Sequence, residues 1–110
     1  MKLYLDTSTD NCILRLNDQE YIREGRYDLA EKIFSFIYAK LQENHADWYD
    51  ISEITFFSGP GSFTGLRIGA AIVNALADQL NIPLFDENGV QHKIILPNYG
   101  RPANISKPKK

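Results

Sequence analysis

The sequence predicts an α/β fold, a mixed sheet with two helices packed side by side, in the order β-β-β-α-β-α-β. Three short β-prone runs open the chain with little sequence between them, which is typical of an antiparallel meander. Residues 54–86 then show a strand, a glycine-rich turn, a long apolar helix and a second strand. That pattern predicts a parallel pair joined by a crossover helix. The 110 residues suffice for one domain with one core.

The three opening strands are expected at residues 2–5, 12–16 and 19–23. Apolar and other side chains alternate in the second of them, so Cys12, Leu14 and Leu16 are expected on one face. Asn17 and Asp18 form a tight-turn pair before the third strand.

The first helix is expected at residues 28–44, with Asp28 and Glu31 spaced like a capping box. Its apolar residues cover roughly 200° of the helix, well beyond the single stripe that one core contact needs. A polar connection follows the helix, and Trp48 and Tyr49 are expected to pack over a helix end.

The second helix is expected to begin after Ser62, a candidate N-cap, and to end at Asn81. Its apolar arc spans roughly 220°, and Arg67, Asn74 and Asp78 mark the solvated side. Both helices thus carry more apolar surface than one face of a sheet requires. The excess predicts an exposed apolar surface of the kind that binds another protein.

The last elements are a strand at residues 82–85 and a β-prone run at residues 93–96. Residues 97–110 are rich in proline and polar side chains, which predicts an extended tail ordered only where it docks. The expected organisation is therefore one lobe over residues 1–96 and a tail over residues 97–110.

Composition excludes several classes of protein. A net charge of −2 gives no electrostatic basis for unassisted nucleic-acid binding, and one cysteine excludes an internal disulfide and a cysteine-based zinc site. The sequence shows no signal peptide and no apolar run of membrane-spanning length, so a cytoplasmic protein without a membrane partner is expected. His45 and His92 have no evident ligand or triad partner, and no catalytic or metal site is expected.

Two polar motifs leave alternatives open. The residues after the first strand could hold a metal–phosphate group, or could form a polar turn that satisfies its own backbone. The glycine-rich turn could approach a nucleotide, or could simply be a tight strand-to-helix turn, and an anion could rest on its amides. The residues concerned are Asp6, Thr7, Ser8, Gly59, Gly61 and Ser62.

Two stretches resemble a known family. LDTST at residues 5–9 and SGPGSFTGLRIGAAIVNALADQLNIPLF at residues 58–85 are similar to the amino-terminal lobe of the TsaB (formerly YeaZ) family of tRNA threonylcarbamoyladenosine biosynthesis. The likeness covers residues 1 to about 86, and residues 96–102 look like the family's final segment. The resemblance implies a single actin-like, sugar-kinase-type lobe (the ASKHA, ribonuclease H-like class) joined to the family's carboxy-terminal tail.

The resemblance also implies a function. Family members are mainly non-catalytic: they bind the catalytic subunit TsaD through the two amino-lobe helices, and the ATPase TsaE joins the pair. TsaD modifies an adenosine next to the anticodon. This chain would then bind no cofactor, with ATP on partner subunits, would reach tRNA only through the complex, and would form a heterodimer, or a homodimer when alone. The expected interface residues are Phe34, Ile37, Leu41, Gly65, Ile68, Gly69, Ile72 and Leu76.

Two alternatives remain beside this hypothesis. One is a nucleotide-binding half-site of an actin-fold ATPase or of a peptidase-like protein, in which the polar motifs would contact phosphate or ribose, although no protease residues are evident. The other alternative is a chain that has lost its role.

Overall fold

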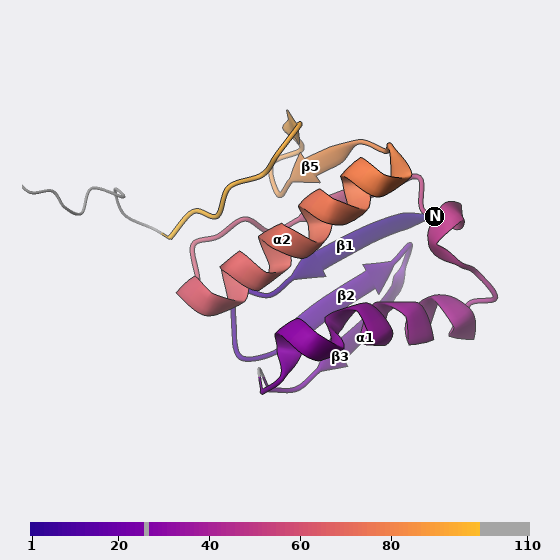
Figure 1. Ribbon diagram of the computed structural model, residues 1–110, viewed down its shortest axis with the longest axis horizontal. Coiled ribbons are helices and arrows are strands. Elements are labelled where there is room, and N and C mark those ends of the chain that lie inside the picture. The colour runs from indigo at the N-terminus through magenta and orange to yellow at the C-terminus, as the bar shows by residue number, and fades with distance from the viewer. Residues whose placement is uncertain (26, 100–110) are drawn as a thin grey trace, which may run out of the picture.

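A mixed sheet organises the fold, which a computed structural model describes for residues 1–25 and 27–99. Within these residues the strand order is β3-β2-β1-β4-β5-β6 (Figure 1). The strands are β1 (Lys2–Asp6), β2 (Cys12–Leu16), β3 (Gln19–Arg23), β4 (Glu53–Phe56), β5 (Leu84–Asp86) and β6 (Gln91–His92). The helices are α1 (Leu29–Glu43), the short 3₁₀ helix η1 (Trp48–Asp50) and α2 (Phe63–Leu80).

The predicted topology is confirmed. β1, β2 and β3 form an antiparallel meander, whereas β1 pairs with β4, and β4 with β5, in parallel. The helix α2 makes the crossover between β4 and β5. A short antiparallel strand, β6, completes the far edge of the sheet.

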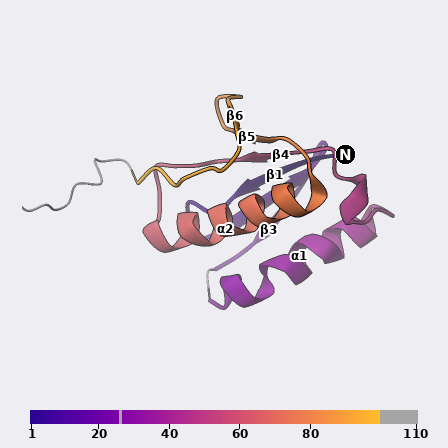
Figure 2. The ribbon, with the colours of Figure 1, turned by 45° about the horizontal axis from the view of Figure 1, so that its top comes forward.

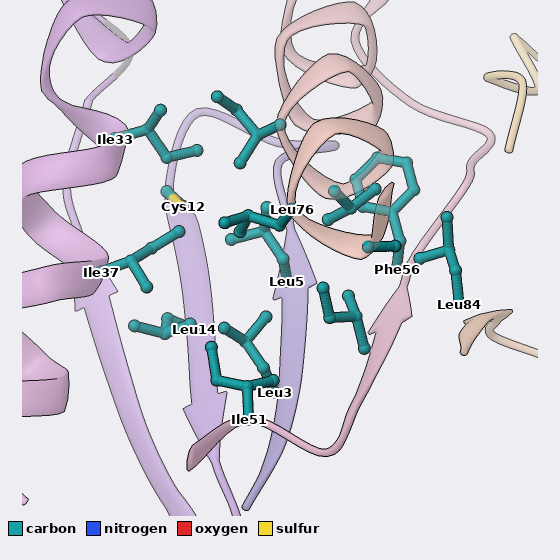
Figure 3. Close-up of a cluster of buried hydrophobic side chains, with 14 of the residues drawn as sticks. Leu3, Leu5, Cys12, Leu14, Ile33, Ile37, Ile51, Phe56, Leu76 and Leu84 are labelled. Atoms are coloured by element: carbon teal, nitrogen blue, oxygen red, sulfur yellow. The ribbon is translucent and has the colours of Figure 1, made fainter. Parts of the chain in front are cut away.

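Both helices lie on the same side of the sheet, α2 over its centre and α1 over the β2–β3 side (Figures 1 and 2). The core fills the space between the helices and this face, as Figure 3 shows. Alternate residues of the strands point into it: Leu3 and Leu5 of β1 and Leu14 of β2 are no more than 1% exposed. Burial of this kind contributes about 1.5–3 kcal/mol for each large apolar side chain.

The opposite face of the sheet carries no helix among the described residues (Figure 2). Tyr4 and Arg15 face each other across β1 and β2 there, and the guanidinium carbon lies 4.6 Å from the Tyr4 ring centroid. Ile13 and Thr55 on the same face are half-buried. No helix in the described part of the chain is both long and apolar enough to cross a membrane.

The ends of α2 follow the local signals in the sequence. The Ser62 hydroxyl accepts a hydrogen bond from the Gly65 amide at 3.2 Å, as its N-cap position predicts. Asn81 ends the helix in the left-handed conformation, at φ 55°.

The predicted capping box of α1 is wrong. Asp28 precedes the helix in the left-handed conformation and makes no side-chain cap bond. Its carboxylate instead accepts a hydrogen bond from Arg23 at 2.6 Å, since the end of β3 lies beside it. A capping box does form in η1, between Asp47 and Asp50. Tyr49 is 86% exposed, so only Trp48 of the expected pair packs on a helix.

The segment after the sheet is a further correction, because residues 93–96 form no strand. Residues 93–99, here called the strap, run alongside α2 (Figure 2). Ile95 is buried, and the Asn74 side chain donates to its carbonyl at 3.0 Å and accepts from its amide at 2.9 Å. Farther along, the Asn98 amide donates to the Ser58 carbonyl at 2.7 Å. The strap therefore ties the end of the described chain to α2 and to the glycine-rich turn.

The proposed division at residue 97 stays a prediction. Residues 97–99 belong to the docked strap, and Tyr99 lies against Phe63 with ring centroids 4.5 Å apart. Residues 100–110 of the expected tail lie outside the described residues.

Candidate functional site

An apolar groove runs between α1 and α2 on the surface that faces away from the sheet. It holds a cavity of about 370 Å³ near the start of both helices and another of about 430 Å³ near the end of α2. Ala30 and Phe34 of α1 line one wall, and α2 lines the other. The residues that form this interhelix groove are Ala30, Phe34, Trp48, Tyr49, Thr64, Arg67, Ile68, Ala71, Ile72, Leu76, Gln79 and Leu80.

The groove exists because the broad apolar arc of α1 divides into two rows. The residues at i, i+4 spacing from Leu29 through Ile33 and Ile37 face the sheet and are buried. The adjacent row, Phe34 and Tyr38, points to the groove side and remains 42% and 43% exposed. One apolar arc thus supplies both a core face and an exposed face.

Aromatic side chains gather at the end of the groove where α1 meets η1. Trp48 stacks on Tyr38 with ring centroids 5.9 Å apart and meets Phe34 edge-on at 6.0 Å. The capping box of η1 holds the short helix that carries Trp48. Rigid aromatic clusters of this type are frequent binding hot spots. Tyr38 and Trp48 were not among the predicted site residues. The apolar pattern of α1 includes Tyr38, but no sequence pattern near Trp48 indicates that the two rings stack.

The structure brings four of the predicted interface residues to the groove. Phe34 is the most exposed of them, Ile68 is half-buried, and Ile72 and Leu76 line the cavities while remaining 8% and 7% exposed. Because these last two also complete the core, a partner would reach only their outer atoms.

The other four predicted interface residues are corrected. Ile37 and Leu41 are 0% exposed, because they belong to the row of α1 that faces the sheet. Gly65 and Gly69 are buried where α2 crosses the end of β1. Both positions are filled by this chain itself. A Cβ on Gly65 would lie 2.0 Å from the Thr7 carbonyl oxygen, and a Cβ on Gly69 would lie 2.1 Å from the Thr7 Oγ1 and 2.6 Å from the Phe56 ring.

The polar residues at the end of β1 form hydrogen bonds with one another and with α2. The amide and hydroxyl of Ser8 donate to the Asp6 carboxylate at 2.8 and 2.6 Å. The buried Thr7 hydroxyl donates to the Gly65 carbonyl at 2.7 Å. These bonds are those of a self-satisfied polar turn, and they explain Asp6, Thr7 and Ser8 without a ligand.

The glycine-rich turn is explained in the same way. A Cβ on Gly61 would lie 2.5 Å from the Ser8 Cβ, and one on Gly59 would lie 1.9 Å from the Asn98 carbonyl oxygen. The Ser62 amide donates to the Ser8 carbonyl at 2.7 Å. Close packing against the strap and the β1 turn therefore requires small residues here. A nucleotide at this turn stays a prediction.

The carboxyl ends of β4 and β5 also carry internally paired groups. Glu87 accepts hydrogen bonds from the Ser58 amide and hydroxyl, both at 2.9 Å. Asp86 pairs with His92 at 2.8 Å, so His92 has a partner that no local pattern in the sequence indicates. The hydrogen bond from His92 holds the pKa of Asp86 below its usual range.

The described residues provide neither a metal-binding cluster nor a reactive cysteine thiol. No group of three or more histidine, cysteine, aspartate or glutamate side chains there could hold a metal ion. Burial raises the pKa of the Cys12 thiol to about 11, so the thiol stays protonated at neutral pH and is a weak nucleophile. The interhelix groove is thus one candidate site that packing within the described residues leaves open; a cavity of about 580 Å³ between the end of α2 and β5–β6 is another.

Comparison with known proteins gives the family. Residues 26–103 match the family model described as "TsaD: tRNA N6-adenosine threonylcarbamoyltransferase". The tRNA threonylcarbamoyladenosine biosynthesis protein TsaB of Buchnera aphidicola from Schizaphis graminum is 33% identical over 91 residues, covering 76% of this chain and 41% of that protein. The TsaB protein of Haemophilus influenzae is 33% identical over 86 residues, covering 74% of this chain and 36% of that protein.

A solved structure agrees with these relatives. YeaZ from Pseudomonas aeruginosa superposes with a TM-score of 0.68 at 29% identity, over 77% of this chain and 42% of that one. The predicted actin-like class of fold is thereby confirmed. The chain spans 41% of the Buchnera relative's length and 36% of the Haemophilus relative's. Within the TsaD-like proteins that the family model describes, the chain belongs to the TsaB (YeaZ) family.

Proposed function

We propose that this chain is a non-catalytic binding subunit in tRNA threonylcarbamoyladenosine biosynthesis, which docks on a TsaD-like catalytic subunit through the interhelix groove. The relatives named for this pathway support the process. The observation that carries the docking mode is the groove itself, with its two cavities, its exposed Phe34 and the Tyr38–Trp48 stack at its end.

The shape and chemistry of the groove suit a helix of another protein. Two helical walls with apolar side chains between them accept the apolar face of an amphipathic helix, whose side chains recur every three or four residues. The cavities would take two such side chains, and the Trp48 cluster would bury a third contact at the rim. Because aromatic side chains lose little conformational entropy on binding, this surface is suited to a stable complex.

The catalytic contribution would be indirect. At the strand ends Asp6 pairs with Ser8 and Glu87 pairs with Ser58, so these four described residues are engaged with one another. By binding one conformation of its partner more tightly, the chain would shift the partner towards that conformation. ATP would bind on partner subunits, and tRNA would be reached through the complex.

A matched pair of alanine substitutions tests the docking face. Ala71 is exposed and lines the first cavity, whereas Ala39 is equally an exposed alanine of α1 but lines neither cavity. We expect Ala71→Glu to weaken binding of the cognate TsaD-like subunit about ten- to thirtyfold, because the carboxylate would be desolvated in an apolar groove. We expect Ala39→Glu to stay within about twofold of wild type. Isothermal titration with the purified partner measures both.

The same preparations separate docking from misfolding. Both variants should unfold at the wild-type temperature, since both positions are exposed. A substitution at Ile72 would serve less well, because Ile72 is 8% exposed and its loss would disturb the core. Equal affinity of Ala71→Glu and wild type would contradict the proposed groove. Saturable binding of ATP by the isolated chain would instead favour the nucleotide-binding alternative.

A further inference from the structure

The turn between β5 and β6 presents an asparagine followed by a glycine at the surface. Asn88 and Gly89 are both exposed, and a Cβ added at Gly89 would meet no atom within 4 Å. The backbone amide of Asn88 donates to the Asp86 carboxylate at 2.8 Å, whereas the Asn88 side chain makes no hydrogen bond within the described residues. Neither a side chain on residue 89 nor such a hydrogen bond therefore restrains the Asn88 carboxamide.

The order of these two residues permits a reaction of the chain with itself. The backbone nitrogen of a residue that follows asparagine can approach the side-chain carbonyl carbon, and glycine has no Cβ to obstruct that approach. No other asparagine of the sequence precedes a glycine. Asn17, in the β2–β3 turn, precedes Asp18, and its side-chain oxygen is held by the Lys2 amide at 2.9 Å. Asn88 thus differs from an asparagine in a comparable turn in both respects.

One hydrogen bond holds the reacting nitrogen in the folded turn. The Gly89 amide donates to the Asp86 carbonyl at 3.0 Å, so this bond must open before the nitrogen can attack. The element that follows the turn, β6, has only two residues and forms the edge of the sheet. Short edge elements open locally far more often than core strands do. Reaction at Asn88 therefore requires opening of the hairpin and not unfolding of the protein.

We propose that Asn88 is a site of spontaneous deamidation. The Gly89 nitrogen loses its proton to hydroxide and bonds to the side-chain carbonyl carbon of Asn88, while the bond from that carbon to the side-chain nitrogen breaks. The side-chain nitrogen takes up a proton and leaves as ammonia, and the backbone closes into a five-membered succinimide ring. Water then adds to one of the two ring carbonyl carbons and opens the ring, which leaves either aspartate or isoaspartate. No electrons are transferred, and water is the co-reactant.

Isoaspartate at this position would disrupt the hairpin around Asp86. The Asp86 carboxylate accepts hydrogen bonds from the amides of Asn88 and Val90 at 2.8 and 3.0 Å and pairs with His92 at 2.8 Å. In the isoaspartyl product the main chain runs through the former side chain, which lengthens the turn by a methylene group and displaces these amides. The product also places a further carboxylate beside those of Asp86 and Glu87. We therefore expect β6 to separate from β5 in the modified protein.

Peptide mapping of the full chain, after incubation in a mildly alkaline buffer, tests the proposal. Trypsin cleaves after Arg67 and Lys93, so one peptide of residues 68–93 also contains Asn74 and Asn81 as internal controls. We expect two new forms of this peptide, each heavier by the difference between a hydroxyl and an amino group, with the change at residue 88 alone. The rate should rise in proportion to the hydroxide concentration, because the attacking nitrogen must lose its proton.

Two variants separate this reaction from other sources of the mass change. Gly89→Ala should slow the conversion about tenfold, because the added Cβ obstructs the attacking nitrogen. Asn88→Gln should abolish it, because the longer side chain would have to close a six-membered ring. A synthetic peptide of residues 68–93 is the positive control. If this peptide converts while the folded protein does not, the turn protects Asn88 and the proposal is overturned. Conversion at Asn74 or Asn81 at the same rate would also overturn it.

Hydrogen exchange tests the structural consequence. In the aged wild-type protein, the amides of Asp86 and Val90 should lose their protection, since both belong to the hairpin. Asn88→Asp carries the new charge on an ordinary backbone, so its Asp86 and Val90 amides should stay protected. Unchanged protection in the isoaspartyl protein would show that the hairpin tolerates the longer turn. This inference is independent of the proposed function, because neither experiment uses a partner subunit.

Discussion

Gly65→Ala is expected to destabilise the protein by about 3 kcal/mol, against the usual preference of helices for alanine. Inside a helix, alanine is normally favoured over glycine by about 1 kcal/mol. Here a Cβ would lie 2.0 Å from the Thr7 carbonyl oxygen and 3.3 Å from its carbon, so α2 and the end of β1 must separate. The separation would also strain the buried bond from the Thr7 hydroxyl to the Gly65 carbonyl. Urea unfolding followed by circular dichroism measures the change.

Gly89→Ala is the control for the glycine-to-alanine change itself. Gly89 has φ +79° and no atom within 4 Å of the added Cβ, so the cost should be about 1 kcal/mol, from backbone strain alone. A Gly65→Ala protein as stable as wild type would show that α2 does not approach β1 as closely as described. It would also reopen the glycine face of α2 as a docking surface.

Asn74→Ala is expected to lower the free energy of unfolding by about 2 kcal/mol and to release the strap from α2. The Asn74 amide makes two hydrogen bonds to the backbone of Ile95, at 3.0 and 2.9 Å, and Ile95 is buried. Removing the side chain leaves a donor and an acceptor without their partner in a partly buried position. Hydrogen exchange should show that the Ile95 amide loses its protection before the core strands do.

Gln79→Ala provides the comparison, since Gln79 is another amide side chain of α2 but is exposed. The free energy of unfolding of the Gln79→Ala protein should stay within about 0.5 kcal/mol of wild type. If the Ile95 amide remained protected in Asn74→Ala, the strap would be held by the burial of Ile95 rather than by the amide.

Local signals in the sequence predicted the parts of this fold that depend on neighbours along the chain. Ser62 and Asn81 mark the ends of α2 correctly, because a cap needs only a side chain and the adjacent backbone. The strands at 12–16 and 19–23 were likewise predicted with their observed bounds. Alternation of side chains along a strand suffices for such predictions.

Contacts between distant segments could not be predicted in this way. Asn74 looked like a solvated residue, but the strap gives it a partner that no local pattern indicates. Asp28 does not cap α1, because its carboxylate accepts a hydrogen bond from Arg23 of a neighbouring strand. The apolar arc of α1 indicated burial but not its direction, so Phe34 and Ile37 seemed equivalent although one faces the groove and the other the core.

The one-sided cover of the sheet has a consequence for sequence variation. Along β1 and β2 each residue that faces the helices, such as Leu5 or Leu14, alternates with one that faces solvent, such as Tyr4 or Arg15. Tolerance to charged substitutions should therefore rise and fall with every step along these strands. A saturation library scored for cellular abundance would show this two-residue periodicity. Equal intolerance on both faces would mean that the face without helices is covered in the cell.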